Sequence, residues 1–234
     1  MEKQGLLYEG STKRIFGTEN PDILIMSFQD TITADNGARK ESVAGKGAAC
    51  NRISARIFKY LENRGIPTDF IEETGETETA VRKAEVIPLH VIVRNYSAGR
   101  FQEAVKINEG TQLKTPVVEL NLKSRQLGNP LINGYYVLAL ELATEEEIDR
   151  IVKSALKINT FLKDYFSRIG MDIIDFKLEF GRSKGDIILI DEISPDTCRL
   201  WDKQTHEKLD RDRFRRNLGN VADAYREVLK RTGE

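Results

Sequence analysis

A stretch of alternating charged and apolar residues, 172–181, predicts a β-strand with two unlike faces. Neighbouring side chains of a strand point to opposite faces, so Asp175, Lys177 and Glu179 share one face and the residues between them are apolar. The next predicted strand is apolar from Ile187 until Asp191, near its end. A buried carboxylate costs several kcal/mol unless it is paired or binds a metal. Charged groups in this setting therefore indicate a chemical site.

The pattern of these acidic residues has two interpretations. Carboxylates on neighbouring strands, with a lysine between them, provide the hard oxygen ligands and the cation that a magnesium–nucleotide complex needs. The alternative is an exposed edge strand, on which Lys177 and the carboxylates form a solvated ladder of ion pairs. Both interpretations stay open at this point.

The composition excludes several classes of protein. The chain has 234 residues with 36 Lys and Arg against 37 Asp and Glu, and its formal charge of -1 offers no global field for nucleic acid or an anionic membrane. Its apolar runs are far shorter than the ~20 residues that span a bilayer. The first residues lack a secretory signal and the two cysteines form no CxxC pair, so we expect a cytoplasmic protein. Neither histidine has a ligand-spaced partner, which argues against a zinc site.

The order of predicted elements indicates an α+β protein of two lobes. In chain order, the predicted elements are a hairpin of 11–16 and 22–28, a helix over 47–63, a strand pair of 69–73 and 86–94, a short helix at 100–106, loops and strands through 142, a helix at 144–169 that begins with a capping box, strands at 171–180 and 186–194, and a C-terminal helix from 212. We expect a strand-rich, nucleotide-binding lobe over residues 1–84 and an α+β lobe over 85–234 that carries the metal and ribonucleotide site.

Three further segments carry groups suited to anionic ligands. The turn at 8–16 can lay backbone N–H groups and Lys13 over a triphosphate, although it matches neither the P-loop nor GxGxxG. Arg94 ends an apolar strand beside a helix start, a natural clamp for phosphate or carboxylate. Arg199 lies in a polar loop directly after the acidic strand. Each also has a purely structural interpretation, such as an ordinary turn or an arginine bound to surface carbonyls.

Several segments, in this order, match one known family. The most specific are 91–95 with 97–99, 175–181, and 191–196 leading to 199–202. With these segments, and over nearly its whole length, the sequence resembles the SAICAR synthetase family of purine biosynthesis. Chance assembly of all three matches is not credible.

The resemblance implies an ATP-dependent ligase. The carboxylate of carboxyaminoimidazole ribonucleotide (CAIR) would be joined to the amine of L-aspartate, with release of ADP and phosphate. Because a carboxylate is a poor electrophile, an acyl phosphate is expected as the intermediate. Mg²⁺, lysine and arginine would offset the negative charge of the assembled substrates. The resemblance also implies a two-lobed fold related to kinases and ATP-grasp enzymes, with nucleotide in the cleft, and a homodimer.

The resemblance further implies a role for individual residues. The catalytic residues would be Asp175, Lys177 and Arg199. ATP would be bound by Gly10, Ser11, Lys13, Lys83, Lys177, Glu179 and Asp191. The substrates would be bound by Asp35, Lys46, Arg94, Ser97, Arg100, Asp175 and Arg199. Mg²⁺ would be bound by Glu179 and Asp191, with Asp175 facing the ribonucleotide or a further Mg²⁺.

The match departs from the family pattern at a few positions. His90 stands where related sequences often have Glu, Arg100 where many have Ser, and Asn129 where Asp is usual. Ser11 stands where some relatives carry a lysine. These departures concern contacts outside the acidic set.

Two other functions fit parts of the pattern. A kinase-like phosphotransferase would move the γ-phosphate to an alcohol, but it would favour a His-Arg-Asp loop and an Asp-Phe-Gly motif, which this chain lacks. A nucleic-acid-binding module would use the C-terminal arginines at 211, 213, 215 and 216. Acidic residues interrupt that surface, so we predict a solvated helix face instead.

Overall fold

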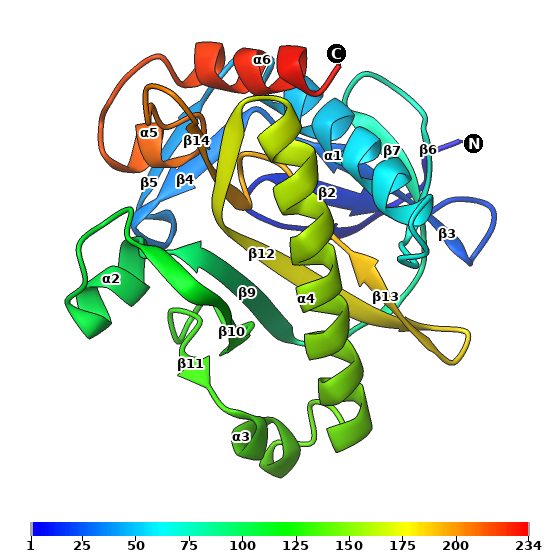
Figure 1. The fold of residues 1–234 in the computed structure, drawn as a ribbon. Helices are drawn as coiled ribbons and strands as arrows, with labels where there is room; N and C mark the ends of the chain where they lie inside the picture. Colours follow the sequence, from blue (N-terminus) through cyan, green and yellow to red (C-terminus); the bar gives the residue numbers. More distant parts are fainter. Residues whose placement is uncertain (1, 234) are drawn as a thin grey trace.

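Residues near the N-terminus form a five-stranded antiparallel sheet, called here the first sheet (Figure 1). This computed structural model describes residues 2–233. The strands of the first sheet, in spatial order, are β1 (Leu6–Glu9), β2 (Lys13–Phe16), β3 (Ile23–Phe28), β7 (Glu78–Arg82) and β6 (Phe70–Glu73). The predicted hairpin is confirmed as β2 and β3, with Lys13 opposite Phe28. A separate pair, β4 (Thr31–Ala34) and β5 (Arg39–Ser42), is joined through the 3₁₀ turn η1 (Asp35–Gly37).

The second sheet is built around β12 (Met171–Ser183), the long strand predicted to have a charged face. Its other strands are β11 (Leu131–Ile132), β10 (Gln112–Leu122), β9 (Leu89–Tyr96), β13 (Asp186–Ile190), β14 (Cys198–Asp202) and β8 (Glu85–Val86). Residues 175 and 176 pair with β9 and β14 at once, so both edges of β12 are occupied there. The interpretation of this segment as an exposed edge strand is therefore wrong.

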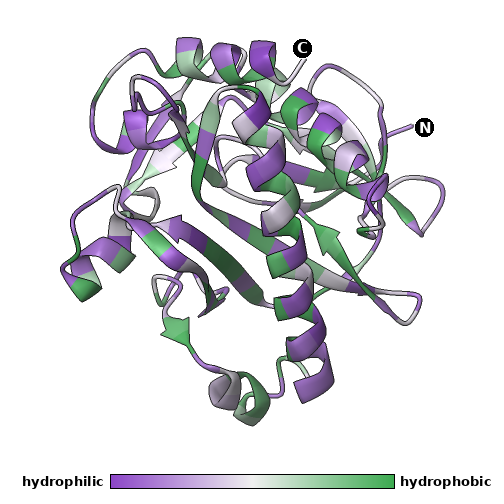
Figure 2. Cartoon of the chain, in the orientation of Figure 1, coloured by the Kyte–Doolittle hydropathy of each residue, from purple (hydrophilic) through white to green (hydrophobic). Residues whose placement is uncertain are grey.

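Six α-helices flank the sheets: α1 (Lys46–Glu62), α2 (Gly99–Val105), α3 (Gly134–Ala139), α4 (Glu145–Arg168), α5 (Asp212–Arg215) and α6 (Val221–Arg231), counted within residues 2–233. The predicted capping box of α4 is confirmed, since Thr144 and Glu147 exchange side-chain to backbone hydrogen bonds. The helix runs across β12 and alternates polar and apolar residues, as expected when one face covers a sheet (Figures 1 and 2). No helix in the described part of the chain is long and apolar enough to cross a membrane.

One continuous apolar core joins the two sheets. It includes Phe28 of the first sheet, Phe176 of β12, Phe166 of α4 and Tyr225 of α6, all nearly inaccessible to solvent. The first sheet falls within residues 1–84 and the second within 85–234. The division into two lobes at that boundary stays a prediction.

Several predicted elements are wrong in detail. The segments 69–73 and 86–94 do not pair with each other: β6 pairs with β7, a strand that was not predicted, and β9 pairs with β10 and β12. The strand predicted over 186–194 ends at Ile190, because Asp191 adopts a left-handed backbone with φ +74. The short helix α3 was also not predicted.

The C-terminal segment is not one helix with a solvated arginine face. Asn217, Gly219 and Asn220 have φ values of 54, 70 and 51, which are incompatible with a right-handed helix, and the chain divides into α5 and α6. Arg213 is buried and donates to the carbonyl oxygen of Gly219 (2.7 Å). Arg211 donates to the carbonyl oxygen of Thr33 (2.8 Å). These two arginines therefore pack against the protein itself, whereas Arg215 and Arg216 are exposed, as predicted.

The Glu147 side chain gives a test of how charge stabilises the α4–β12 contact. Arg182 of β12 donates two hydrogen bonds to its carboxylate, at 2.6 and 2.9 Å. These hydrogen bonds from Arg182 lower the pKa of Glu147 to about 2. A carboxyl whose pKa is lowered by folding stabilises the fold above its unfolded pKa, and the effect is lost as the pH falls through the folded pKa.

We predict that Glu147→Gln lowers the free energy of unfolding by about 1 kcal/mol at neutral pH. The substitution keeps a side-chain oxygen that can accept the Thr144 N–H of the capping box, but it removes the charge. The difference from the wild type should shrink as the pH falls from 4.5, the ordinary pKa of Glu, towards about 2. Urea unfolding of both proteins at a series of pH values measures it. A difference that stays constant over this range would contradict the role of the charge.

Candidate active site

Lysines from both sheets meet a group of carboxylates near the end of β13. Lys13, at the start of β2, contacts Asp191 and lies 2.9 Å from Glu192 Oε1. Lys177 of β12 contacts Glu179 and lies 2.9 Å from Asp191 Oδ2. We call these five residues the lysine–carboxylate cluster. It joins two segments that are 178 residues apart in the sequence.

Local backbone geometry explains how this cluster forms. Strand alternation places Lys177 and Glu179 on the same face of β12, as predicted. The left-handed conformation of Asp191 turns the chain immediately after β13, and its two carboxylate oxygens contact one lysine each. Left-handed backbone is costly for a residue other than glycine but tolerated by Asp, and such conformations concentrate at functional sites.

Four groups of the cluster hold one another in their charged forms: Lys13, Lys177, Glu179 and Asp191. Burial by itself lowers the pKa of Lys13, but the negative charges of Asp191 and Glu192 outweigh it and raise that pKa above its ordinary value. Burial also lowers the pKa of Lys177, but the negative charges of Asp191 and Glu179 outweigh it and raise that pKa above its ordinary value. Burial would raise the pKa of Glu179, yet the Lys177 charge holds it well below its usual range. These four groups therefore act through their opposite charges rather than as proton donors or acceptors.

Two further side chains that were not assigned from the sequence contact Glu179. Lys123 Nζ lies 2.5 Å from Glu179 Oε2, and His90 Nε2 lies 3.3 Å from Oε1. Lys123 comes from the segment after β10, so only the pairing of β10 with β9 brings it here. No sequence pattern marks it. For His90, the only signal was its departure from the family pattern. The expectation that such departures concern contacts outside the acidic set is wrong at this residue, since His90 contacts Glu179.

The second cluster lies further along the same face of β12. Asp175 is in register with Arg94 of β9 on one side and with Arg199 of β14 on the other. Its carboxylate accepts hydrogen bonds from Arg94 Nη1 at 2.7 Å and from Arg199 Nη1 at 2.8 and 3.0 Å. An irregularity between residues 173 and 175 sets this register on the β14 side. We call these three residues the arginine cluster.

Other carboxylates complete the arginine cluster. Glu119 of β10 accepts two hydrogen bonds from Arg94, at 2.8 and 2.9 Å. Asp212 accepts one from Arg199 at 2.8 Å and is almost fully buried. Sequence reasoning assigned neither residue to the site. Asp212 lies at the C-terminal end of the family resemblance, which runs to residues 212–215. The position of Glu119 depends on the register between β9 and β10.

The predicted turn at Ser97 also reaches the arginine cluster. The Ala98 carbonyl oxygen lies 3.5 Å from Arg94 Nη1, and Ser97 is fully buried. Gly99 has φ +54, and a Cβ atom built there would lie 2.6 Å from Arg199 Nη2. Glycine is required at this position because it provides both the conformation and the close approach.

Other predicted site residues lie on turns or apart from both clusters. Gly10 donates its backbone N–H to the Lys13 carbonyl oxygen (2.8 Å), and Ser11 is exposed in the same turn. Lys83 is exposed just beyond β7. Arg100 is exposed and donates to the Gly128 carbonyl oxygen at 3.0 Å. Asp35 is exposed in η1.

Lys46 is enclosed rather than presented to solvent. It is 2% exposed, and its Nζ lies 2.5 Å from Asp196 Oδ2. Asp196 also accepts a hydrogen bond from Tyr225 at 2.8 Å. Ligand atoms of Cys50, Glu192 and Asp196 lie within 4.8 Å of one another, a spacing that could suit a metal. Because the Lys46 ammonium already neutralises Asp196, we assign no metal there.

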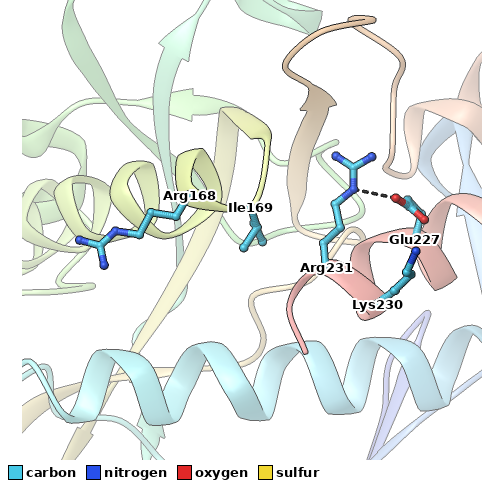
Figure 3. Close-up of a pocket in the computed structure, with 5 residues that line it drawn as sticks. All are labelled: Arg168, Ile169, Glu227, Lys230 and Arg231. Carbon is cyan, nitrogen blue, oxygen red and sulfur yellow. Dashed lines mark hydrogen bonds and ion pairs between the residues drawn. The ribbon is translucent and has the colours of Figure 1, made fainter. Parts of the chain in front are cut away.

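A surface pocket lies between the end of α4 and α6, away from both clusters (Figure 3). It is lined by Arg168, Ile169, Glu227, Lys230 and Arg231. Arg231 is paired with Glu227 at 2.7 Å and with Asp202 at 2.8 Å. None of the predicted site residues lines this pocket, and we assign it no function.

Comparison with known proteins places the chain in a family. Residues 6–232 match the family described as SAICAR synthetase. A phosphoribosylaminoimidazole-succinocarboxamide synthase of Lachnoclostridium phytofermentans is 53% identical over 233 residues, covering 100% of this chain and 99% of that protein. The chain belongs to the SAICAR synthetase family.

Solved structures agree with this assignment. A phosphoribosylaminoimidazole-succinocarboxamide synthase from Ehrlichia chaffeensis has a TM-score of 0.96 at 41% identity, with 98% of each chain covered. A SAICAR synthetase solved in complex with ADP has a TM-score of 0.95 at 43% identity, again with 98% of each chain covered. The α+β fold expected from the family resemblance is therefore confirmed.

We predict that Asp175→Asn lowers the free energy of unfolding by about 3 kcal/mol, because it removes the carboxylate that the buried Arg94 and the half-buried Arg199 share. Asp172→Asn is the matched control: it makes the same substitution on the same strand at a half-buried site, for which no ion pair is found among the described residues. Chemical unfolding of both variants at neutral pH measures the effect. Equal losses in the two variants would contradict the pairing of Asp175 with both arginines.

Proposed function

We propose that this chain joins the carboxylate of CAIR to the amine of L-aspartate in an ATP-dependent step of purine biosynthesis, giving SAICAR, ADP and phosphate. Membership of the SAICAR synthetase family supports the reaction, and the ADP complex of a relative at 43% identity supports nucleotide use. The observation that carries the proposal is the meeting of Lys13 with Lys177, Glu179 and Asp191 between the two sheets.

The lysine–carboxylate cluster is proposed to hold the nucleotide phosphates. Lys13 follows a turn in which the Gly10 N–H is bonded to the Lys13 carbonyl oxygen, and the Ser11 backbone N–H is suited to phosphate oxygens. Gly10 is assigned to the nucleotide from the family resemblance. Lys177 is the second ammonium group, on the neighbouring sheet. Lys83, beyond β7, is assigned to the nucleotide from the family resemblance. Two ammonium groups would offset the repulsion between the triphosphate and the acidic side chains.

The donor set of Glu179 and Asp191 fits Mg²⁺. Both side chains offer hard carboxylate oxygens, and both already converge on one cation, the Lys177 ammonium. When bound, Mg²⁺ would supply charge neutralisation at the phosphates. Asp175 suits this task less, because two arginines already neutralise it. Of its two suggested roles, we therefore favour the one at the ribonucleotide.

The arginine cluster is proposed to bind the ribonucleotide. Arg94 and Arg199 are suited to phosphate and carboxylate, and Asp175, Glu119 and Asp212 hold them in fixed orientations. Ser97, Arg100 and Asp35 are assigned to the same substrate from the family resemblance. Lys46 could take part only if its buried pair with Asp196 opened.

We propose an acyl phosphate as the intermediate. The CAIR carboxylate oxygen attacks the γ-phosphorus and ADP leaves, which turns a poor electrophile into a good one. The aspartate amine then attacks the acyl carbon and phosphate leaves with the bonding electron pair, while the amine loses a proton. Lys177 and Arg199 are assigned to stabilise the charge that develops on the transferred group, a role that their positive charges support.

We predict that ADP formation with ATP and Mg²⁺ requires both CAIR and L-aspartate. A kinase-like phosphotransferase acting on an alcohol would not need aspartate. A coupled assay for ADP, with each substrate omitted in turn, measures the requirement. Turnover that is indifferent to aspartate would overturn the ligase proposal.

We predict that Glu179→Gln and Asp191→Asn each lower kcat at least about 100-fold, because each removes a charge assigned to Mg²⁺. Both proteins should keep a folded core, which circular dichroism checks. A Mg²⁺ titration of activity should also shift to higher concentration. Variants with an unchanged Mg²⁺ requirement would remove these residues from the metal site.

We also propose a homodimer, as the family resemblance implies. Exposed apolar residues gather on and around α3, which we call the α3 patch: Leu127, Leu131, Tyr135, Tyr136, Leu138 and Leu140. A large exposed apolar surface is characteristic of an interaction site.

The predicted cytoplasmic location also stays a proposal, with which the two buried free cysteines are compatible.

If the α3 patch forms the dimer contact, a Tyr135→Glu, Leu138→Glu variant should be a monomer when the wild type is a dimer. Leu218→Glu, at an exposed leucine outside the patch, is the control and should leave the dimer intact. Light scattering after size exclusion measures the mass of each. A monomeric wild type across the micromolar range would contradict the dimer.

A further inference from the structure

Lys13 has two carboxylate partners in unlike surroundings. The Asp191 side chain is 14% exposed and is shared with Lys177, whereas the Glu192 side chain is 2% exposed. Under the proposed function, Asp191 is a metal ligand. A divalent cation there would compete with the Lys13 ammonium for the same carboxylate. Such competition would leave the ion pair between Lys13 and Glu192 intact.

Glu192 is itself fixed from the protein interior. Its Oε1 atom lies 2.9 Å from Lys13 Nζ, and its Oε2 atom accepts a hydrogen bond from Ser194 Oγ at 2.6 Å. Ser194 Oγ in turn accepts the backbone N–H of Asp196 at 3.1 Å. Both Glu192 oxygens therefore have a partner, which fixes the carboxylate.

The contacts continue to two helices. The Asp196 carboxylate is paired with Lys46, the first residue of α1, and accepts a hydrogen bond from Tyr225 of α6. Glu192, Ser194 and Asp196 are all at least nine-tenths buried. A continuous set of buried polar contacts thus leads from Lys13 into the core. Such a network is rigid when every member is satisfied.

We propose that Glu192 is a positioning residue that holds the Lys13 ammonium in place for the nucleotide phosphates while Asp191 is engaged with the metal. Glu192 acts through Lys13 and does not contact substrate. The inference rests on the proposed role of Lys13 at the phosphates. Nothing in the sequence pattern distinguished Glu192 from its neighbour, because the division of roles depends on burial and on the turn at Asp191.

The test is a double-mutant cycle on ADP binding, measured by calorimetry with Mg²⁺. Glu192→Gln keeps the shape of the side chain and should weaken ADP binding about tenfold, since the negative charge that attracts the Lys13 ammonium is lost. Lys13→Met should weaken it at least as much. In the Lys13→Met background, Glu192→Gln should have no further effect, because its action passes through Lys13.

Two more variants separate positioning from simple structural support. Ser194→Ala frees the second Glu192 oxygen and should weaken ADP binding about threefold, and it covers the case in which Glu192→Gln does not fold. Glu147→Gln removes a carboxylate–guanidinium pair outside the site and should destabilise the protein without changing ADP affinity. Unchanged ADP affinity in a folded Glu192→Gln protein, or an equal loss in both Lys13 backgrounds, would overturn the inference.

The activity of the wild type tests the proposed function, and the cycle on ADP binding tests the role of Glu192. If the wild type binds ADP but does not convert CAIR and aspartate, the ligase proposal fails, and the cycle on ADP binding alone decides the role of Glu192. If the wild type is active and the cycle is additive, the ligase proposal stands and the role of Glu192 is contradicted.

Discussion

The neutralisation of buried charge across two sheets is the interaction on which this structure depends. Lys13 comes from the first sheet, and the carboxylates that compensate it come from the end of the second. Each of these charges would cost several kcal/mol if it were buried alone. The contact between the β2–β3 hairpin and the turn after β13 therefore stabilises both segments. The same requirement assembles the candidate site, so folding and binding depend on one set of contacts.

Strand β12 sets the distance between the two clusters. Residues 175 and 179 face the same side, and four residues of a strand span about 13 Å. Under the proposed function, the nucleotide phosphates and the ribonucleotide lie at the two ends of this stretch, with Lys177 between them. Both substrates are anionic, and cationic side chains are found at both ends. A central strand with both edges paired gives these groups a rigid support.

Sequence reasoning predicted the features that depend on local chemistry. The alternation of β12, the capping box at Thr144 and the hairpin before Phe28 all follow from short-range patterns, and the structure has them. Long-range pairing was less accessible. Glu119, which pairs with Arg94, and Lys123, which pairs with Glu179, reach the site only through the register of β10 with β9.

Backbone conformation explains most of the remaining differences. Left-handed residues after α5 break a helix whose apolar spacing looked continuous. The same conformation at Asp191 ends β13 early and gives Asp191 and Glu192 different surroundings. The spacing of apolar residues does not indicate such positions, because one left-handed residue changes the direction of the chain without changing that spacing. The likeness to the family, by contrast, identified the fold because its motifs extend over nearly the whole chain.

A crystal structure with ADP, Mg²⁺ and CAIR bound tests the central claim most directly. The account requires the metal between the Glu179 and Asp191 carboxylates, the phosphates beside Lys13 and Lys177, and the ribonucleotide at Arg94 and Arg199. Nucleotide phosphates bound away from Lys13, with Glu179 and Asp191 still paired only to lysine, would contradict it.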